Sequence, residues 1–302
     1  WGAQAEQDSI ATIHAALDAG VTLIDTAPAY GDGLSEEIVG RALRGRRGRA
    51  VLATKIGEAD MTPERTVASC EASLRRLQTD CIDLLQIHWL GTGERLEEVI
   101  AAMEKLRADG KVRTLGVCNF GPRSLARLRA AGHGWITNQL SYNLVWRAIE
   151  FEIVGACERD GLGILCYSPL QQGLLTGRFR TPEEVPVGRH RTRHFRSDRP
   201  MSRHGGAGCE TLTFATLERI RAVAVRLGQP MADVALAWLL HRPGVSAVIF
   251  GARTPRQVHE NLAASRLRLD AGTLEELDRA TDELKTALGP NADLWAGEPR
   301  IR

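Results

Sequence analysis

The sequence lacks the cysteine patterns that hold metal ions or structural disulfides. Its six cysteines form no CxxC pair and no His–Cys spacing typical of a metal site. They are Cys70, Cys81, Cys118, Cys157, Cys166 and Cys209. We therefore expect a reduced, cytoplasmic chain with no metal site.

Long apolar runs and a strong excess of charge are also missing. No apolar stretch approaches the roughly 18 residues that a membrane-spanning helix needs, and the first residues are acidic rather than signal-like. The net charge of +2 and the pI near 8.3 give no sign of an extended nucleic-acid surface. We expect neither a membrane nor nucleic acid among its partners, and the sequence leaves the oligomeric state open.

What the sequence does contain is a regular alternation of apolar runs and helical patterns. The runs predict strands over residues 21–27, 50–55, 81–89, 112–118, 135–141, 161–168 and 246–252. Helical patterns lie near 10–17, 62–77, 96–106, 122–131, 149–160, 213–227 and 231–242, and Thr62 and Pro63 are a typical helix start. Repeated strand and helix predicts a parallel sheet, and so many repeats favour a closed (β/α)8 TIM barrel of one domain, residues 1–302.

Ionisable side chains occur where the first three of these strands end. Asp25, Lys55 and His88 each close an apolar run. Because side chains alternate across a strand, each shares a face with residues two positions earlier, such as Gln86 before His88. A parallel barrel carries its reactive groups at the carboxyl ends of its strands, so we predict that these side chains meet at one site.

Tyr30 lies five residues after Asp25, in the segment APAYGDG (27–33), whose glycines allow a sharp turn. A phenol with a pKa near 10 is a poor acid at neutral pH, and lowering that pKa by three units requires about 4 kcal/mol of preferential stabilisation of the phenolate. We expect Lys55 to lower the pKa of Tyr30, with Asp25 keeping the lysine protonated. His88 would orient a carbonyl oxygen or share the proton transfer.

Two other interpretations of these residues are weaker. Asp25 and Lys55 could form a purely structural pair, but Tyr30 and His88 at matching positions make catalysis the better explanation. Asp25 and His88 could instead bind a metal ion in a barrel hydrolase. No second histidine at a strand end completes such a ligand set, and Lys55 would repel the ion.

The segments that contain these residues resemble those of the aldo-keto reductase family. They are GVTLIDTAPAYGDGLSEEIVGRAL from Gly20, LATKIG from Leu52, RLQTDCIDLLQIHW from Arg76 and GKVRTLGVCNF from Gly110. The resemblance spans nearly the whole chain and places four residues on the family's catalytic tetrad: Asp25, Tyr30, Lys55 and His88. It implies reduction of an aldehyde or ketone by hydride transfer from NADPH, with Tyr30 as the proton donor.

The resemblance also bears on the number of strands, since seven are one too few for this barrel. Family members complete an amino-terminal hairpin and a first strand before the position of Trp1. We therefore expect that strand one is missing because the sequence is truncated before Trp1. The alternative, a barrel with a gap, would expose two strand edges. An extra helix should pack across one end of the barrel, opened by a capping box of Thr273 and Glu276.

No Gly-x-Gly-x-x-Gly loop follows a strand, so a Rossmann dinucleotide site is absent. The resemblance instead assigns cofactor contacts in three groups. Those near the nicotinamide are Cys118, Asn119, Gln139 and Tyr167, with Cys118 in place of the family's usual serine. Those at the pyrophosphate are Ser168, Pro169, Leu170, Gly173, Leu174, Thr176 and Arg178, and those at the adenosine and its 2′-phosphate are Gly251, Arg253, Gln257, Glu260 and Asn261.

The choice between NADPH and NADH depends on the segment around Arg253. Thr254 and Pro255 look like a helix start, and a helix N-terminus beside an arginine is suited to an anion. NADPH is therefore expected rather than NADH.

Eight arginines occur from Arg178 to Arg203 without helical periodicity, which predicts a long Arg-rich loop over residues 180–210. One interpretation is a solvated, mobile connection. The other is a lid in which Arg189, Arg191 or Arg193 covers the cofactor phosphates or an anionic substrate. The solvated connection is the favoured interpretation, and the sequence does not choose between the three arginines.

A different hypothesis is that the protein binds the cofactor but that catalytic turnover is not its main function. Some family members act mainly as interaction subunits whose bound cofactor reports redox state, and the tetrad is compatible with that role. The sequence also does not identify which small carbonyl compound would be the substrate, because specificity lies in loops whose conformation varies.

Overall fold

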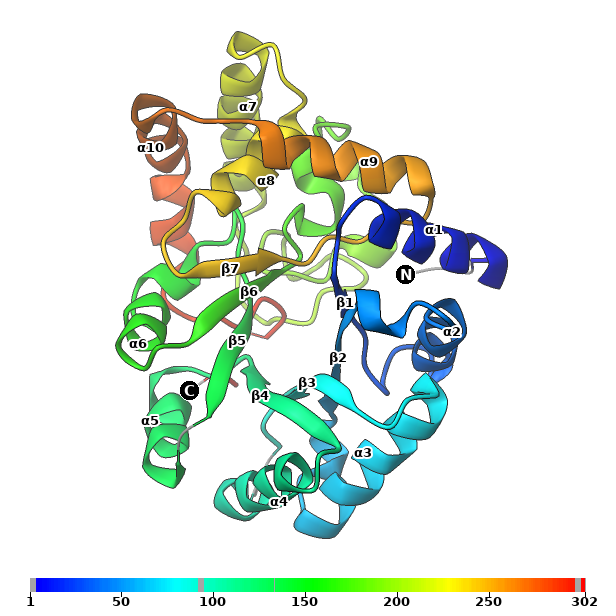
Figure 1. Cartoon of the computed structure of the whole chain (residues 1–302). Helices are drawn as coiled ribbons and strands as arrows, with labels where there is room; N and C mark the ends of the chain where they lie inside the picture. The colour runs from blue at the N-terminus through cyan, green and yellow to red at the C-terminus, as the bar shows by residue number, and fades with distance from the viewer. Residues whose placement is uncertain (1–3, 92–94, 133, 297–299, 302) are drawn as a thin grey trace. The chain divides into compact units, whose positions relative to one another are not determined.

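The computed structural model describes residues 4–91, 95–132, 134–296 and 300–301. Within them the seven predicted strands are all present (Figure 1): β1 (Leu23–Asp25), β2 (Val51–Ile56), β3 (Ile82–Ile87), β4 (Val112–Cys118), β5 (Trp135–Ser141), β6 (Gly163–Tyr167) and β7 (Val245–Val248). Neighbouring strands follow the order of the sequence, and the pairs β1–β2, β2–β3, β3–β4 and β6–β7 are parallel. The predicted parallel sheet is confirmed, and a strand upstream of Trp1 stays a prediction.

Helices alternate with these strands along the chain. The α-helices are α1 (Glu6–Asp18), α2 (Leu34–Ala42), α3 (Pro63–Leu77), α4 (Leu96–Ala108), α5 (Pro122–Ala131), α6 (Ile153–Arg159), α7 (Glu210–Arg226), α8 (Met231–Leu240), α9 (Pro255–Ala263) and α10 (Ala271–Leu288). Short 3-10 turns are η1 (Arg47–Arg49), η2 (Glu58–Asp60), η3 (Ala148–Glu150), η4 (Gln171–Thr176), η5 (Pro182–Glu184), η6 (Val187–Arg189) and η7 (Ala264–Arg266). No single helix of the described residues is long and apolar enough to cross a membrane; α7 and α8, bent by 93°, satisfy length and composition only as a pair.

Two helix starts test the capping predictions. At α3, Thr62 Oγ1 accepts from the backbone N–H of Arg65, as predicted. At α10 the predicted capping box is wrong: Asp270 Oδ1 accepts from the N–H of Thr273 at 2.7 Å, so Asp270 is the N-cap and Thr273 lies inside the first turn. A carboxylate beside the positive end of a helix is a favoured cap, and here it takes the N–H that would otherwise be unsatisfied.

The chain divides into two compact units. The first contains Trp1–Asn138 and Gly251–Glu260, and the second contains Gln139–Phe250 and Asn261–Arg302. Strands β1 to β4 belong to the first unit, and β6 and β7 to the second. Each unit has its own buried apolar residues, such as Leu52 and Leu85 in the first and Trp238 in the second. The expectation of one domain over residues 1–302 stays a prediction.

The two faces of β2 have different partners, which orients the residues of interest. On one face, Thr54 Oγ1 donates to Glu36 Oε1 of α2 at 2.6 Å, and Arg76 Nε of α3 donates to Glu36 Oε2 at 2.7 Å. Glu36 and Thr54 are fully buried, so this contact fastens α2 and α3 to the sheet. Because side chains alternate, the neighbouring Lys55 points to the opposite face.

Candidate active site

Lys55 forms a buried ion pair at the end of β2. Its Nζ donates to Asp25 Oδ2 at 2.6 Å and to the carbonyl oxygen of Thr26 at 2.9 Å. The Lys55 side chain is fully buried and that of Asp25 is 7% exposed. Burial alone would lower the pKa of Lys55, but the surrounding groups, Asp25 foremost, together outweigh it, and the pKa of Lys55 is raised. Lys55 is therefore a fixed cation.

Tyr30 lies beside this cation, in the turn that follows β1. Gly31 and Gly33 have φ values of 65° and 90°, and a Cβ on Gly33 would lie 2.8 Å from Arg76 Cδ, so the close approach requires glycine there. Lys55 Nζ is 5.0 Å from the centroid of the Tyr30 ring. The Tyr30 and His88 rings meet edge to face, with centroids 5.9 Å apart. The structure thus brings all four predicted tetrad residues together within the first unit.

The acidity of Tyr30 differs from the sequence prediction. Partial desolvation raises the pKa of Tyr30, although the residue as a whole is 40% exposed, and the charge of Lys55 lowers it by less. The predicted net lowering is therefore wrong, because the cost of removing a phenolate from water exceeds the gain from one ammonium. Tyr30 is protonated at neutral pH, as a proton donor must be.

His88 is neutral at physiological pH. Desolvation and the nearby Lys55 ammonium lower the pKa of His88 to about 4, although Asp25 acts in the opposite direction. A neutral imidazole can donate one hydrogen bond and accept another. Asn119, which has a positive φ of 60°, donates from Nδ2 to the carbonyl oxygen of His88 at 3.1 Å. This contact links the end of β4 to the end of β3.

Gln86 is a member of this cluster to which the sequence interpretation gave no role. It is fully buried, and its Nε2 lies 3.4 Å from Asp25 Oδ1. The signal was present in the sequence, because Gln86 is a polar residue in a row of the strand that it shares with Leu84 and His88 and that should point inward.

In the second unit, the predicted pyrophosphate loop has an unusual backbone. Ser168, Gln171, Gln172 and Gly173 have φ values of 54°, 44°, 53° and 97°. Asn143 holds this loop, since its Nδ2 donates to Ser168 O at 3.0 Å and to Gln171 Oε1 at 2.8 Å. Non-glycine residues seldom adopt this conformation without support, which suggests that the loop shape serves a ligand.

Two guanidinium groups approach this loop at Gly173. A Cβ on Gly173 would lie 3.0 Å from a terminal nitrogen of Arg178 and 3.0 Å from one of Arg189. Arg189 also donates to the carbonyl oxygen of Gln172 at 2.9 Å. Over the described ranges neither arginine pairs with a carboxylate. The side-chain amide of Gln172 is likewise buried with no partner there. Guanidinium groups that pair with no carboxylate suit an anion.

The Arg-rich loop is not a purely solvated connection. Its buried residues are Val185, His190, Thr192, His194, Phe195, His204 and Glu210. His194 Nε2 donates to Val145 O at 2.8 Å, while His194 Nδ1 accepts from Gln171 and Thr192 at 3.1 Å each. Arg193 donates to two backbone carbonyls, those of Leu288 and Asn291. Of the three arginines considered for a lid, Arg189 therefore lies at the predicted pyrophosphate loop, and Arg193 bonds the carbonyls of Leu288 and Asn291 instead.

The predicted adenosine end begins a helix, as expected. Gln257 N–H donates to Thr254 Oγ1 at 3.3 Å, and Arg253 N–H donates to Gln257 Oε1 at 2.7 Å. Gln4 bonds Arg253 twice: its Nε2 donates to Arg253 O at 2.9 Å and its Oε1 accepts from Arg253 Nε at 3.2 Å. Glu260 pairs with Arg256 at 3.2 Å. No local pattern could have predicted the role of Gln4, which is 249 positions from Arg253.

Comparison with known proteins decides the family. A model described as "Aldo/keto reductase family" matches residues 1–282. The chain belongs to the aldo/keto reductase family.

Individual relatives of this aldo/keto reductase agree with that assignment. It is 36% identical over 270 residues to "Aldo-keto reductase YhdN" of Bacillus subtilis (strain 168), covering 85% of this chain and 78% of that protein. It is 34% identical over 290 residues to "Methylglyoxal reductase YeaE" of Escherichia coli (strain K12), covering 95% and 89%. A crystal structure of an aldo/keto reductase from Klebsiella pneumoniae in complex with NADP and acetate matches with a TM-score of 0.74, 34% identity and coverage of 91% and 85%. The chain is accordingly an NAD(P)H-dependent oxidoreductase with the aldo/keto reductase fold.

The other cofactor positions expected from the family resemblance lie mostly at strand ends or in the loops that follow. Cys118 ends β4 with 1% exposure, and burial raises the pKa of its thiol. Gln139 lies in β5 and Tyr167 ends β6. Pro169, Leu170 and Leu174 continue the loop after β6, where Thr176 Oγ1 donates to Gly173 O at 2.7 Å. Gly251 follows β7, and Asn261 lies in α9.

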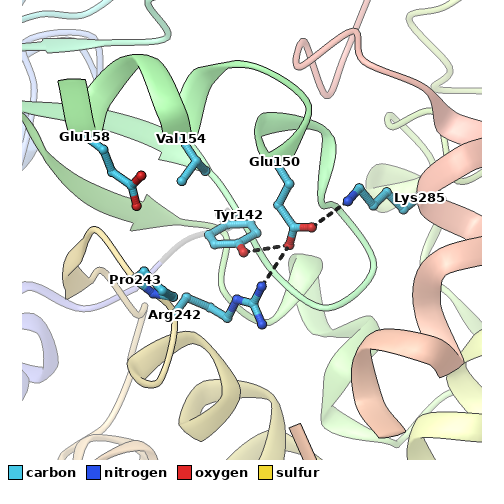
Figure 2. A pocket seen from close by; sticks show the side chains of 7 residues that line it. All are labelled: Tyr142, Glu150, Val154, Glu158, Arg242, Pro243 and Lys285. Carbon is cyan, nitrogen blue, oxygen red and sulfur yellow. Dashed lines mark hydrogen bonds and ion pairs between the residues drawn. The ribbon is translucent and has the colours of Figure 1, made fainter. Parts of the chain in front are cut away.

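A separate pocket in the second unit contains none of the predicted site residues of this aldo/keto reductase. It has a volume of about 270 Å³ and is lined by Tyr142, Glu150, Val154, Glu158, Arg242, Pro243 and Lys285. Figure 2 shows Tyr142, Arg242 and Lys285 directed at the Glu150 carboxylate; Tyr142 Oη donates to it at 2.7 Å and Lys285 Nζ at 2.8 Å. Arg147 adds two further bonds at 2.8 Å. The pocket is thus the surface of an ion network that joins η3 to α10.

Two buried aromatic residues of the second unit have defined partners. Tyr142 bonds Glu150. Trp146 is fully buried beside the His194 ring and the Arg193 guanidinium, which lie 5.4 and 5.6 Å from its ring centroid. Across the ranges described, no group of three or more His, Cys, Asp or Glu residues could hold a metal ion.

Proposed function

We propose that this aldo/keto reductase uses NADPH to reduce the carbonyl group of a small aldehyde or ketone, with Tyr30 as the proton donor. The observation that carries the proposal is the arrangement around Tyr30: a protonated phenol lies beside a buried, paired Lys55 ammonium and a neutral His88 imidazole. Few other chemistries need a phenol, a fixed cation and a neutral hydrogen-bond donor at one solvent-accessible point.

The roles of the side chains follow from their charge states. When bound, NADPH supplies the hydride that the carbonyl carbon accepts. The negative charge that grows on the carbonyl oxygen is neutralised by the proton of Tyr30. Lys55 stabilises the phenolate that remains, and Asp25 keeps Lys55 protonated. His88, neutral near pH 7, donates a hydrogen bond that orients the carbonyl oxygen.

The cofactor assignment is supported by the arginines. Arg178 and Arg189 converge on Gly173, where a Cβ would occupy the space between them, and this arrangement fits the pyrophosphate. Arg253 beside the start of α9 fits the 2′-phosphate that distinguishes NADPH from NADH. The Klebsiella relative was crystallised with NADP. The remaining predicted contacts stay proposals for the same cofactor: Cys118, Asn119, Gln139, Tyr167, Ser168, Pro169, Leu170, Leu174, Thr176, Gly251, Gln257, Glu260 and Asn261.

The name of the Escherichia coli relative suggests methylglyoxal as the first substrate to measure. We expect NADPH oxidation with methylglyoxal, and Tyr30→Phe should lower kcat by at least about 100-fold while leaving the NADPH dissociation constant unchanged, since general acid catalysis contributes about 10² to 10⁴ in rate. Tyr142→Phe is the matched control, because Tyr142 is a buried tyrosine bonded to Glu150, and its kcat should match the wild type. Turnover that persists in Tyr30→Phe rules out the assigned proton donor.

The same assay separates the enzyme from a redox-reporting interaction subunit. Multiple turnovers with small aldehydes support the enzyme. A single slow oxidation of bound NADPH, together with a stable complex with another protein, supports the subunit.

The cofactor assignment has its own test at Arg253. Removing a hydrogen bond to a charged phosphate costs about 1.5–3 kcal/mol, so Arg253→Ala should raise the NADPH dissociation constant by at least about tenfold and change that for NADH little. Arg256→Ala is the control, since Arg256 lies in the same turn but pairs with Glu260. Equal effects of Arg253→Ala on both cofactors would refute the 2′-phosphate contact.

A further inference from the structure

Gln86 is a polar residue on the catalytic face of β3 that the reaction scheme above does not use. It lies in the row of residues that runs across β2, β3 and β4, where its register partners are Lys55 and Gly116. Gly116 leaves the room that the Gln86 side chain fills, because a Cβ there would lie 3.2 Å from Gln86 Cγ. Gln86 is fully buried.

The Gln86 amide faces the carboxylate that holds Lys55. Gln86 Nε2 donates to Asp25 Oδ1 at 3.4 Å, while Lys55 Nζ donates to Asp25 Oδ2 at 2.6 Å. Each Asp25 oxygen therefore has its own donor. The orientation of the amide follows from Asp25, since a carboxylate only accepts hydrogen bonds and so must face the NH2 group.

At its other end the amide is unsatisfied. Gln86 Oε1 is buried with no hydrogen-bond partner among the residues described, so the bond to Asp25 is the one that its side chain makes there. A buried polar atom without a partner is unfavourable for folding, and a leucine of similar volume would avoid that cost. Stability alone would favour a leucine at this position. The presence of a glutamine that contacts Asp25 therefore points to a role in the site.

We propose that Gln86 is a positioning residue that holds Asp25 in the orientation that keeps Lys55 beside Tyr30. The inference rests on the proposed function of Tyr30 and Lys55. Without the amide N–H, Asp25 Oδ1 loses the contact to Gln86 at 3.4 Å, and the carboxylate is held less firmly in its orientation beside Lys55. Its charge is then less compensated. Because the charge of Asp25 raises the pKa of Tyr30, the phenol becomes a weaker acid.

The first test compares Gln86→Leu with Thr54→Val in the full-length chain. Both residues are fully buried on neighbouring strands, but Thr54 faces away from the site and bonds Glu36. We expect Gln86→Leu to unfold at nearly the same urea concentration as the wild type, because removing the unpaired Oε1 offsets the contact that Asp25 loses. The variant should lower kcat with methylglyoxal about tenfold, the effect of one hydrogen bond. Its NADPH dissociation constant should stay unchanged. Thr54→Val should show the opposite pattern, lower stability with unchanged kcat.

A second variant, Gln86→Glu, supplies a pH signature that a structural role would not produce. Two carboxyl groups at hydrogen-bond distance share one proton. At low pH the shared proton takes the place of the amide N–H, and as the pH rises the pair ionises and repels. The ratio of the kcat of Gln86→Glu to that of the wild type should therefore fall as the pH rises. The same ratio for Gln86→Leu should stay constant over that pH range.

The titration of Tyr30 gives a readout that does not depend on turnover. It is measured as phenolate absorbance, with the Tyr30→Phe variant subtracted, and should move to higher pH in Gln86→Leu. If the wild type and all variants bind NADPH but reduce no carbonyl, the proposed function fails while this titration still tests Gln86. An unmoved titration, or equal losses of stability and kcat in Gln86→Leu and Thr54→Val, would overturn the positioning role.

Discussion

The buried pair of Lys55 and Asp25 makes a prediction about stability as well as catalysis. Replacing Lys55 by methionine keeps most of the side-chain volume and leaves the Asp25 carboxylate, 7% exposed, without its cation. Removing one partner of a buried ion pair costs about 3–5 kcal/mol, because the remaining charge is uncompensated. Asp25 keeps the longer contact to Gln86 at 3.4 Å, so we expect Lys55→Met to lower the free energy of unfolding by about 3 kcal/mol, the lower end of this range.

The double variant separates the charge effect from packing. With both charges removed, in Lys55→Met together with Asp25→Leu, no buried charge is left alone, and the stability should return to within about 1 kcal/mol of the wild type. Neither variant should oxidise NADPH with methylglyoxal at a measurable rate. The assay is equilibrium urea denaturation followed by circular dichroism, with the slope against urea checked for constancy.

A Lys55→Met variant that loses less than about 1 kcal/mol, or a double variant no more stable than the single one, would refute the account of a buried and mutually dependent pair.

Two further predictions concern buried groups outside the tetrad. Arg76→Met should lower the free energy of unfolding by about 3 kcal/mol, because it leaves the fully buried Glu36 carboxylate with Thr54 as its one side-chain partner. Arg75 is an exposed arginine of the same helix, and Arg75→Met should change the free energy of unfolding little. Chemical denaturation of both variants measures the difference. Burial lowers the pKa of His194 to about 4 from 6.5, so the unfolded state takes up a proton at higher pH than the folded state does, and stability falls as the pH drops from 6.5 to 4, by about 3 kcal/mol from this group. His194→Gln should show a flatter stability profile over that interval, and an unchanged slope would mean that His194 is protonated alike in both states.

Much of the fold and the tetrad could be predicted from local patterns. The seven strands follow from apolar runs, and Thr62 and Pro63 mark the start of α3, because periodicity and capping act over a few residues. The alternation of side chains along a strand then placed Lys55 and His88 on the faces where the structure has them. These features depend on neighbours in sequence, which is why one sequence is enough to predict them.

Only the tertiary structure decided the features that depend on distant contacts and on desolvation. The pKa of Tyr30 is raised rather than lowered because packing removes more water from the phenol than one lysine can offset. The proposed role of Gln86 depends on its contact with Asp25, which is 61 positions away, and that of Arg189 depends on its position beside Gly173. Residue types and their spacing specify which groups a strand end presents; the balance of burial and charge around each group exists only once the chain has folded.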